Sequence, residues 1–388
     1  MKNNEKKPAH DKKDEKKKEG KLGSKGETEN ETVLNSSGNL EEQKRREMVS
    51  KWMEGTGPEA DIVISSRVRL ARNVRGVPFP CLASEEQRER IFRLLDKILK
   101  EKSERFSGYS LINMSELSPV QRQVLVEKHL ISLFIIREPE FSALCISPDE
   151  VMSIMVNEED HFRLQCFLPG LQLEKAWETV SCYDDYLEEQ VDYAFCEELG
   201  YLTASPTNVG TGLRASVMLH LPALVLTGQI NRIHSAIGQV GLVVDGMFGE
   251  GTDMIGRLFQ ISNQVTLGQT EEEIWQNLYG VTNQIINQER AAREQLLNAG
   301  REKLADRVGR AYGILKYARL LGFQEAMQLI SDVRLGVEMR MINNIPLKIL
   351  NELLVLTRSG CLQNLKEKTL SYYERDLERS AQIKKSLP

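Results

Sequence analysis

Three short apolar runs separated by turn residues constrain the fold of this 388-residue chain more than any other feature. They cover residues 141–147, 151–157 and 162–168, and Pro148 and Asp149 provide a turn between the first two. Parallel neighbours need long crossover connections, so strands spaced this closely predict an antiparallel meander. A long helix is predicted next, from Leu173 to Leu199, with Gly200 as its C-terminal stop.

The spacing of the apolar residues divides the chain into a part with strands and helices and a part with helices alone. Further strands are predicted at 61–64, 213–220, 242–244 and 257–261, and helices at 84–99, around 127–129 and at 230–238. Beyond Thr270 the strand signals disappear and apolar residues recur at helical spacing. We therefore predict an α+β domain, with helices flanking an antiparallel sheet, followed by an all-α C-terminal domain.

Length and composition set the predicted domain boundaries. A chain of 388 residues is expected to form more than one domain. Residues 1–48 are rich in Lys, Glu, Asn and Ser and nearly lack large apolar side chains, so a disordered charged tail is predicted. A basic binding arm is the alternative, although acids are interleaved with the lysines. Residues 49–294 would form the α+β domain and residues 295–388 the helical domain.

Charge and cysteine usage narrow the classes of partner. A net charge of -5 gives no bulk attraction to nucleic acid or to an anionic membrane, and neither is an expected partner. The six cysteines form no CxxC pairs, which argues against a zinc site or a disulfide framework. No apolar run approaches the roughly 18 residues of a membrane span, and the charged N-terminus lacks a signal-peptide core. A cytoplasmic location is predicted.

The segment Ser205–Pro222 joins a glycine-containing loop to a buried strand. Gly210 and Gly212 interrupt any regular period, whereas residues 213–220 are apolar and partly β-branched. Arg214 would thereby enter the interior, where its planar guanidinium suits a phosphate or a carboxylate. A structural ion pair is the alternative for a single buried arginine.

Three other segments accompany this one. Arg67 and Arg69 follow the strand-like run at 61–64 and would share one face of a strand. Residues 157–163 (NEEDHFR) follow a second run, and residues 246–251 (GMFGEG) form another glycine-rich turn. From about Trp52 onwards the chain resembles the phosphagen kinase family, and most closely its bacterial branch, the protein arginine kinases of the McsB type.

The resemblance implies a kinase that uses ATP and Mg²⁺. The chain has no GxxxxGK[ST] loop and no HRD and DFG pair, so arginine side chains would hold the phosphates. Magnesium would be held by phosphates and water, with no protein metal site expected. By resemblance the ATP-binding residues are Ser65, Ser66, Arg67, Val68, Arg69, His129, Arg163, Arg214, Ala215, Ser216, Val217, Met218, Asp245, Gly246, Met247, Phe248, Gly249 and Glu250.

The acceptor implied by the family is a guanidinium, whose pKa above about 12 leaves its nitrogens non-nucleophilic until a proton is removed. By resemblance, Glu159 and Glu250 would orient this group and accept the proton. Viewed without the family, each is a loop glutamate exposed to solvent. Ser205 occupies the third catalytic position, where the family usually has cysteine. A hydroxyl supplies no negative charge there, so slower turnover is predicted.

A second departure concerns Asp245. The family has a fifth phosphate-binding arginine before Gly246, and here an acid replaces it. A charge about 4 Å from a phosphate is worth roughly 4 kcal/mol at an effective dielectric of 20, so reversing its sign weakens ATP binding. The sequence leaves two alternatives open. Asp245 could point away from the phosphates, or Arg257 could supply the missing positive charge.

The C-terminal segment 374–380 (ERDLERS) resembles the RDxxRA motif with which McsB-type proteins bind phosphoarginine. Arg375 and Arg379 are four residues apart and would share a helix face. The resemblance assigns Asp376 and Ser380 to the same site. A solvated, charged helix end is the alternative.

The function predicted from the resemblance is phosphorylation of arginine side chains in target proteins, which marks them for Clp-type proteolysis in the stress response. Implied partners are arginine-containing protein substrates, an McsA-like activator, a Clp ATPase and a second copy in a homodimer, and the enzyme would be allosteric. The rival hypothesis is a catalytically weak or inactive pseudokinase that acts as a phosphoarginine-binding adaptor. A free-arginine kinase is a third, disfavoured because an N-terminal helical domain is missing before Trp52.

Overall fold

The computed structural model describes residues 41–101, 104–246 and 255–388. The chain divides into two compact units, residues 1–43 and 44–388, and the description below concerns the second. Most of the predicted tail, residues 1–48, therefore lies outside the described residues. Its last part is ordered: residues 44–47 are helical, and Met48 is buried with Trp52 in a core formed mainly by C-terminal helices.

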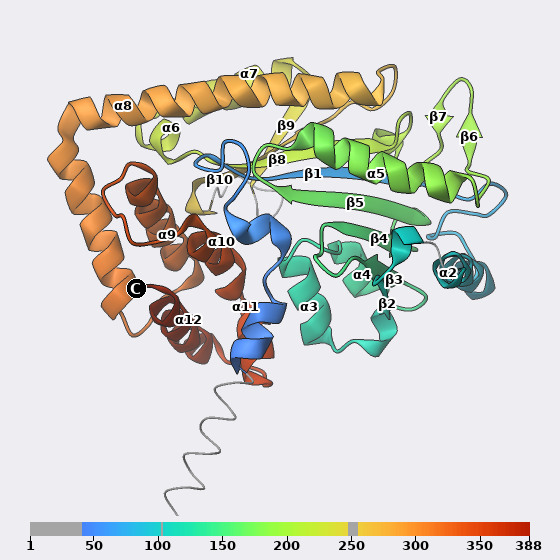
Figure 1. Ribbon diagram of the computed structural model, residues 1–388, viewed down its shortest axis with the longest axis horizontal. Helices are drawn as coiled ribbons and strands as arrows, with labels where there is room; N and C mark the ends of the chain where they lie inside the picture. Colours follow the sequence, from blue (N-terminus) through green and yellow to red (C-terminus); the bar gives the residue numbers. More distant parts are fainter. Residues whose placement is uncertain (1–40, 102–103, 247–254) are drawn as a thin grey trace, which may run out of the picture. The chain divides into compact units, whose positions relative to one another are not determined.

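An antiparallel sheet of eight strands, in the order β2-β3-β4-β5-β1-β8-β10-β9, forms the centre of this unit (Figure 1). The predicted meander is confirmed, because β3, β4 and β5 pair as antiparallel neighbours. The edge strand β2 was not predicted. The strands are β1 Val63–Arg72, β2 Ser110–Asn113, β3 Ala143–Ile146, β4 Met152–Val156, β5 Phe162–Pro169, β8 Leu213–His220, β9 Leu242–Gly246 and β10 Leu258–Asn263.

Helices cover one face of the sheet and bury its apolar residues. Helix α5 packs on β1 and β5, and the first part of α8 packs on β8 and β10 (Figure 1). Alternate strand residues such as Val68, Cys166 and Val217 point into this core. The helices of the α+β region are α2 Glu85–Lys100, α3 Pro119–Glu127, α4 Leu133–Arg137, α5 Leu173–Glu188, α6 Pro222–Leu226 and α7 Ile230–Gln239, of which α3 and α4 pack on the opposite face, against Leu144 and Met155.

Helix α5 ends at Glu188, and the predicted extension to Leu199 is wrong. The following segment pairs instead with residues 73–75, just beyond β1: Arg75 N donates to Asp192 O at 2.8 Å, and Ala194 N donates to Asn73 O at 2.7 Å. These sheet-like bonds replace the helical ones. A two-stranded hairpin follows, formed by β6 (Phe195–Cys196) and β7 (Gly200–Tyr201), so Gly200 lies in a strand and does not end the helix.

The C-terminal part is helical, as predicted. It consists of α8 Glu271–Tyr317, with a non-helical residue at Gly300, α9 Phe323–Glu338, α10 Leu347–Leu356, α11 Ser359–Lys366 and α12 Tyr372–Ser386. Their apolar faces form a second core that includes Phe167, Met218 and Leu258 of the sheet. The α+β fold followed by helices is thus confirmed. The boundary proposed between residues 294 and 295 lies within α8 and stays a prediction.

Candidate active site

Four arginines lie side by side on the sheet face opposite α5. Residues directly opposite each other in an antiparallel pair point to the same side. Arg69 is opposite Arg214 of β8, and Ala71, two residues from Arg69, is opposite Arg163 of β5. Arg67 and Arg69 share a strand face because they are two residues apart, as predicted. We call Arg67, Arg69, Arg163 and Arg214 the arginine cluster.

Neighbouring strands fix the side chain of Arg67. Its Nη2 donates to Gln260 Oε1 of β10 at 3.0 Å, and its Nε donates to Ser216 Oγ at 3.4 Å. The guanidinium carbon lies 5.6 Å from the centre of the Phe167 ring. On the neighbouring strand, Arg214 Nη2 donates to Ser262 Oγ at 3.4 Å. These neutral hydrogen-bond partners orient the guanidinium groups.

The cluster is a region of concentrated positive charge. Burial, reinforced by repulsion from Arg163 and Arg214, lowers the pKa of Arg67 to about 9. Burial and the three other arginines also lower the pKa of Arg69 well below its ordinary value. Burial opposes the charge of Arg163 too, but its ion pair with Glu158, at 2.7 Å, outweighs this and raises its pKa. An anion bound here would relieve the repulsion.

The other strand residues predicted to contact ATP alternate between the two faces of the sheet. Ser65 and Met218 are opposite each other and lie on the cluster's face, as does Ser216. Val68, Ala215 and Val217 face the core beneath the helices. Ser66 also points away from the cluster: its Oγ donates to Gly170 O at 2.8 Å and accepts from Gln172 N. The side chains of these last four residues therefore do not reach the cluster.

His129 lies just beyond the helix in which it was predicted, because α3 ends at Glu127. Its φ is 60°, in the left-handed region, and its ring packs edge-on against Trp52. Burial, followed by repulsion from Arg67, lowers its pKa well below the ordinary value, so the ring is neutral. Among the described residues, its Nε2 is buried without a hydrogen-bond partner. His129 thus offers a neutral donor or acceptor near Arg67 and Arg69.

Asp245 lies on β9, next to the strand of Gln260. The two residues are directly opposite each other, so Asp245 shares the cluster's face, and Gln260 lies between it and β8. Arg257 is held elsewhere: its Nη1 donates to Asp332 of α9 at 2.7 Å and to Ser331 at 3.0 Å. Gly246 ends β9. Met247, Phe248, Gly249 and the predicted catalytic Glu250 lie outside the described residues.

The turn between β4 and β5 presents Glu159 to solvent while it buries Glu158 and Asp160. Glu158 binds Arg163, and Asp160 Oδ1 accepts from Asn73 Nδ2 at 2.7 Å. Partial burial and repulsion from Glu158 raise the pKa of Glu159. A carboxylate with a raised pKa is a better proton acceptor, so the shift of Glu159 is in the direction that a general base requires.

The loop containing Ser205 is joined to this turn. Asp160 Oδ1 also accepts from Ala204 N at 2.7 Å, so one buried carboxylate holds both segments. Ser205 is half-buried, and its Oγ lies 2.8 Å from the Thr207 hydroxyl. The predicted catalytic residues Glu159 and Ser205 therefore lie on loops tied together by Asp160. Sequence reasoning missed Asp160, Glu158 and Gln260, because none carries a signal that separates it from a surface polar residue.

The predicted phosphoarginine site borders a pocket of about 410 Å³ lined by Arg375, Asp376 and Arg379 of α12 and by Arg358 at the start of α11. Arg375 stacks on the Tyr372 ring at 4.3 Å. Arg379 is buried: its Nε donates to Thr357 O at 2.8 Å, and its Nη1 donates to Leu321 O and to Asp376. Ser380 Oγ donates to Ala318 O.

These contacts give the four residues different positions. Arg379 and Ser380 fix the helices to each other, whereas Arg375 and Asp376 are only partly buried. Burial lowers the pKa of Arg379. The two arginines line one pocket, as their spacing predicts, but much of the hydrogen-bonding capacity of Arg379 is used within the fold.

The described residues contain neither a metal-binding cluster nor a membrane-spanning helix. No three His, Cys, Asp or Glu side chains lie close enough together to bind a metal ion. In the same part of the chain, no helix combines the length and the apolar character needed to cross a membrane.

Comparisons with known proteins identify the family. Residues 89–292 match the C-terminal catalytic domain of ATP:guanido phosphotransferases, and residues 301–388 match the C-terminal domain of the protein-arginine kinase McsB. The protein-arginine kinase of Pelotomaculum thermopropionicum is 52% identical over 338 residues, which cover 87% of this chain and 95% of the relative. The protein-arginine kinase of Desulforamulus reducens is 51% identical over 340 residues, with the same two coverages.

Solved structures agree. A lombricine kinase shares 27% identity with a TM-score of 0.55, over 64% of this chain and 70% of that protein. A duplicated taurocyamine kinase from Schistosoma mansoni shares 25% identity with a TM-score of 0.54, over 64% and 37%. With these matches added to the arginine cluster and the sheet that holds it, the chain belongs to the ATP:guanido phosphotransferase family and, within it, groups with the protein-arginine kinases.

Proposed function

We propose that this protein transfers the γ-phosphoryl group of ATP to arginine side chains of other proteins. The arginine cluster is the observation that supports this most directly. Four guanidinium groups share one sheet face, and mutual repulsion together with burial lowers the pKa of Arg67 and of Arg69. Keeping such a group buried and charged is unfavourable unless an anion joins it. A polyphosphate carries negative charge and oxygen acceptors that match several guanidinium groups at once.

The cluster would bind the phosphates and stabilise charge on the transferring group. Phosphoryl transfer requires mainly positioning and electrostatic stabilisation, and guanidinium groups fixed by Gln260, Ser216 and Ser262 provide both. The phosphate charge would also restore the depressed pKa of Arg67, which favours binding further. Magnesium would enter with ATP as part of the substrate.

Glu159 would bind the acceptor guanidinium and remove its proton. Its raised pKa and its exposed position suit this role. Glu250 is proposed as the second carboxylate on the strength of the motif alone. Ser205 would contact the guanidinium from the loop that Asp160 holds beside Glu159.

The test is transfer of phosphate to arginine. The protein is incubated with MgATP and an unfolded protein substrate, and acid-labile phosphoarginine is quantified by mass spectrometry. Glu159→Gln is expected to lower the rate by about 10²- to 10⁴-fold, the usual contribution of a general base. Glu140→Gln, an exposed acid before β3, is the matched control and keeps the wild-type rate. An equal rate in Glu159→Gln and wild type contradicts the assignment of Glu159.

A second candidate function rests on Asp245. This acid lies on the same face as the cluster, one strand beyond the glutamine that binds Arg67, and Arg257 is paired with Asp332. A weak or inactive kinase that binds phosphoarginine through α12 is consistent with that placement. Asp245→Arg separates the two functions: if the wild-type protein forms no phosphoarginine and the variant does, the adaptor function is supported. Free arginine, offered as the acceptor, tests the third hypothesis.

Further proposals concern partners. The McsB-type C-terminal domain at residues 301–388 supports phosphoarginine binding in the pocket of Arg375 and Arg379. We also propose allosteric control, transfer of marked proteins to a Clp ATPase under stress, an McsA-like activator and a homodimer. For these, and for a cytoplasmic location, family membership is the support. Pull-down of a phosphoarginine peptide by wild type, and not by Arg375→Ala, tests the pocket.

A further inference from the structure

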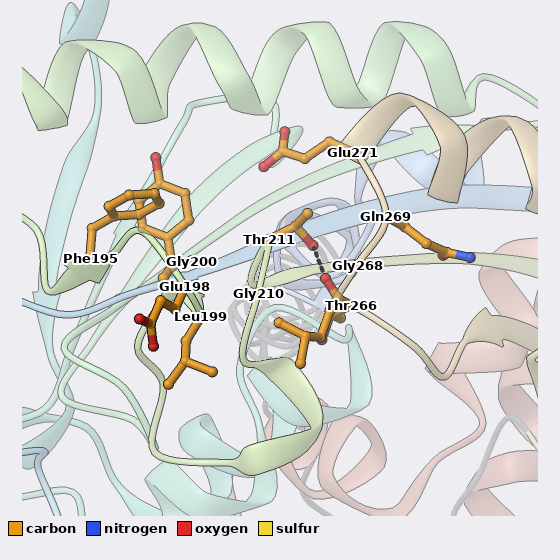
Figure 2. A pocket seen from close by; sticks show the side chains of 12 residues that line it. Phe195, Glu198, Leu199, Gly200, Gly210, Thr211, Thr266, Gly268, Gln269 and Glu271 are labelled. Carbon is orange, nitrogen blue, oxygen red and sulfur yellow. Dashed lines mark hydrogen bonds between the residues drawn. The ribbon is translucent and has the colours of Figure 1, made fainter.

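A second cavity lies beside the Ser205 loop and takes no part in the chemistry described above. It has a volume of about 350 Å³ and lies between the β6–β7 hairpin and the segment that leads into α8 (Figure 2). Phe195, Glu198 and Leu199 approach from the hairpin, and Thr266 and Glu271 approach from the other side (Figure 2). This volume is within the range of small-ligand sites and exceeds that of one large side chain.

The walls of this cavity expose apolar surface. Phe195 and Leu199 are each 45% exposed, and Leu267 on the opposite wall is 50% exposed. Burying such side chains is favourable by roughly 25 cal/mol per Å², so two exposed apolar walls that face one cavity favour an apolar occupant.

Close backbone packing holds the cavity open. A Cβ atom at Gly210, whose φ is 116°, would collide with the Thr266 backbone, and one at Gly200 would collide with Gly210. Tyr201 N donates to Gly210 O at 2.8 Å, and Thr211 N donates to Thr266 O at 3.1 Å. The hairpin, the 210–211 segment and the 266–271 segment are therefore fixed to each other.

The same wall is continuous with the loop of Ser205. Thr266 Oγ1 lies 2.7 Å from Val209 O and 3.1 Å from Thr207 O, so it holds the loop two and four residues beyond Ser205. At the other end of that loop, Asp160 holds Ala204. The loop that contains Ser205 is therefore fixed to one wall of the cavity.

The charge of the cavity lining indicates which residues would flank an apolar side chain bound in the cavity. Glu198 and Glu271 line the cavity, and no lysine or arginine does so among its described lining residues. The negative charge of Glu271 is partly offset by an ion pair with Arg72 and a hydrogen bond from Trp177. Glu198, in contrast, is exposed to solvent. Acidic flanking residues would be repelled here, basic ones attracted and neutral ones tolerated.

Resting on the proposed function, we infer that this cavity binds an apolar side chain a few residues from the target arginine, on an extended, neutral or basic segment of the substrate protein. A free arginine has no chain beyond its own backbone atoms, so only a polypeptide acceptor can occupy both places at once. The cavity would thus select arginines beside apolar residues, which folded proteins keep buried.

The experiment uses peptides with one arginine and one leucine, the leucine placed in turn at each position from four before to four after the arginine. The other residues are serine and glycine, and kcat/KM with MgATP is measured for each. Wild type is expected to prefer one or two positions by about tenfold, within the range for burying one apolar side chain. Phe195→Ser and Leu267→Ser should remove the preference. A second peptide set carries one lysine beside the leucine, and Glu198→Lys should lower kcat/KM for this set.

Controls separate this inference from the proposed function. Leu82→Ser changes a side chain that is 76% exposed and does not line the cavity, so the preference should persist. The small acceptor N-acetylarginine amide should be phosphorylated equally by wild type and by the Phe195 and Leu267 variants. If wild type phosphorylates no peptide, the proposed function fails and this inference with it.

Two outcomes overturn the inference alone. The first is equal kcat/KM for all leucine positions in an active wild type. The second is a change of mass in solution, measured by light scattering, in Phe195→Ser or Leu267→Ser with the peptide preference unchanged, because the apolar walls would then bind a second copy of the chain.

Discussion

Among single residues, Ser205 offers a direct test of how the acceptor is held. Its hydroxyl carries no charge, whereas a thiolate would attract the guanidinium that Glu159 also binds. We predict that Ser205→Cys raises kcat for protein phosphorylation about tenfold, equivalent to 1.4 kcal/mol in the barrier. Ser205→Ala serves as the control and should equal or fall below wild type. A Cys variant no faster than the Ala variant would place Ser205 away from the reacting nitrogen.

His161, two residues after Glu159, should make stability depend on pH. It is fully buried, its Nδ1 accepts from Val74 N at 3.0 Å, and its Nε2 faces Pro78 O at 2.9 Å. Burial lowers its pKa from 6.5 to about 4. The unfolded chain therefore binds the proton first, so stability is full above pH 6.5 and is lost as the pH falls towards 4, by roughly 3 kcal/mol.

Urea unfolding at pH 7 and pH 4.5 measures this loss. His220 has a similarly lowered pKa, so wild type is compared with His161→Gln, which should lose less stability over the same interval. Equal losses in the two proteins would assign the pH dependence to other groups.

Residue patterns anticipated part of the site. Alternation along β1 predicted that Arg67 and Arg69 share a face, because that property depends only on spacing in one strand. Arg69 lies opposite Arg214, and Arg67 contacts Gln260, only because distant strands pair in a particular register. The paired residues are almost 150 positions apart in the first case and more than 190 in the second. No local signal encodes it. Similarly, the RDxxRA-like spacing placed Arg375 and Arg379 in one pocket, but the carbonyl groups that bind Arg379 come from distant loops.

At the level of elements, some helix ends are determined by neighbouring residues and others by contacts with distant segments. The start of α2 was predicted correctly, because Ser84 forms a capping box with Gln87 and both residues are in the sequence window. The end of α5 was predicted incorrectly, because Asp192 and Ala194 pair with residues 73 and 75, more than 100 residues away. Helix ends are therefore predictable where the cap is local and unpredictable where another strand ends the helix.

Contact between α3 and α11 gives a prediction at this scale. The buried carboxylate of Glu127 accepts from Gly360 N and Cys361 N, both at 2.9 Å, and so caps the N-terminus of α11. Glu127→Gln keeps one acceptor and removes the charge that favours a helix N-terminus. We expect a loss of about 1–3 kcal/mol in the free energy of unfolding.

Chemical denaturation measures that loss, with Ser84→Ala at the exposed start of α2 as a capping control worth about 1 kcal/mol. A smaller loss of stability in Glu127→Gln than in Ser84→Ala would contradict the prediction, because water would then replace Glu127 as the acceptor at the N-terminus of α11. His129 follows Glu127 by two residues, so the nucleotide KM of the folded variant reports whether the cap also positions that ring.

Over the whole molecule, a buried charge network joins the sheet region to the C-terminal helices. Glu338 of α9 binds Arg334 of its own helix, Arg293 of α8 at 2.7 Å, and His220 at the end of β8. Nearby, Arg257 binds Asp332. The side chain of Glu338 has no exposed surface, and Arg293 lowers its pKa despite burial. The sheet region and the helical region should therefore unfold together.

Removing this one carboxylate should weaken both regions. Glu338→Gln leaves Arg293 and Arg334 buried without their shared acid, which typically costs about 3–5 kcal/mol in the free energy of unfolding. Calorimetry is expected to show one transition at a lower temperature. Asp306→Asn breaks an exposed pair with Arg310 and should change stability by less than about 1 kcal/mol. Two separate transitions in wild type would contradict the coupling, because Glu338 would then stabilise only the helices that contain it.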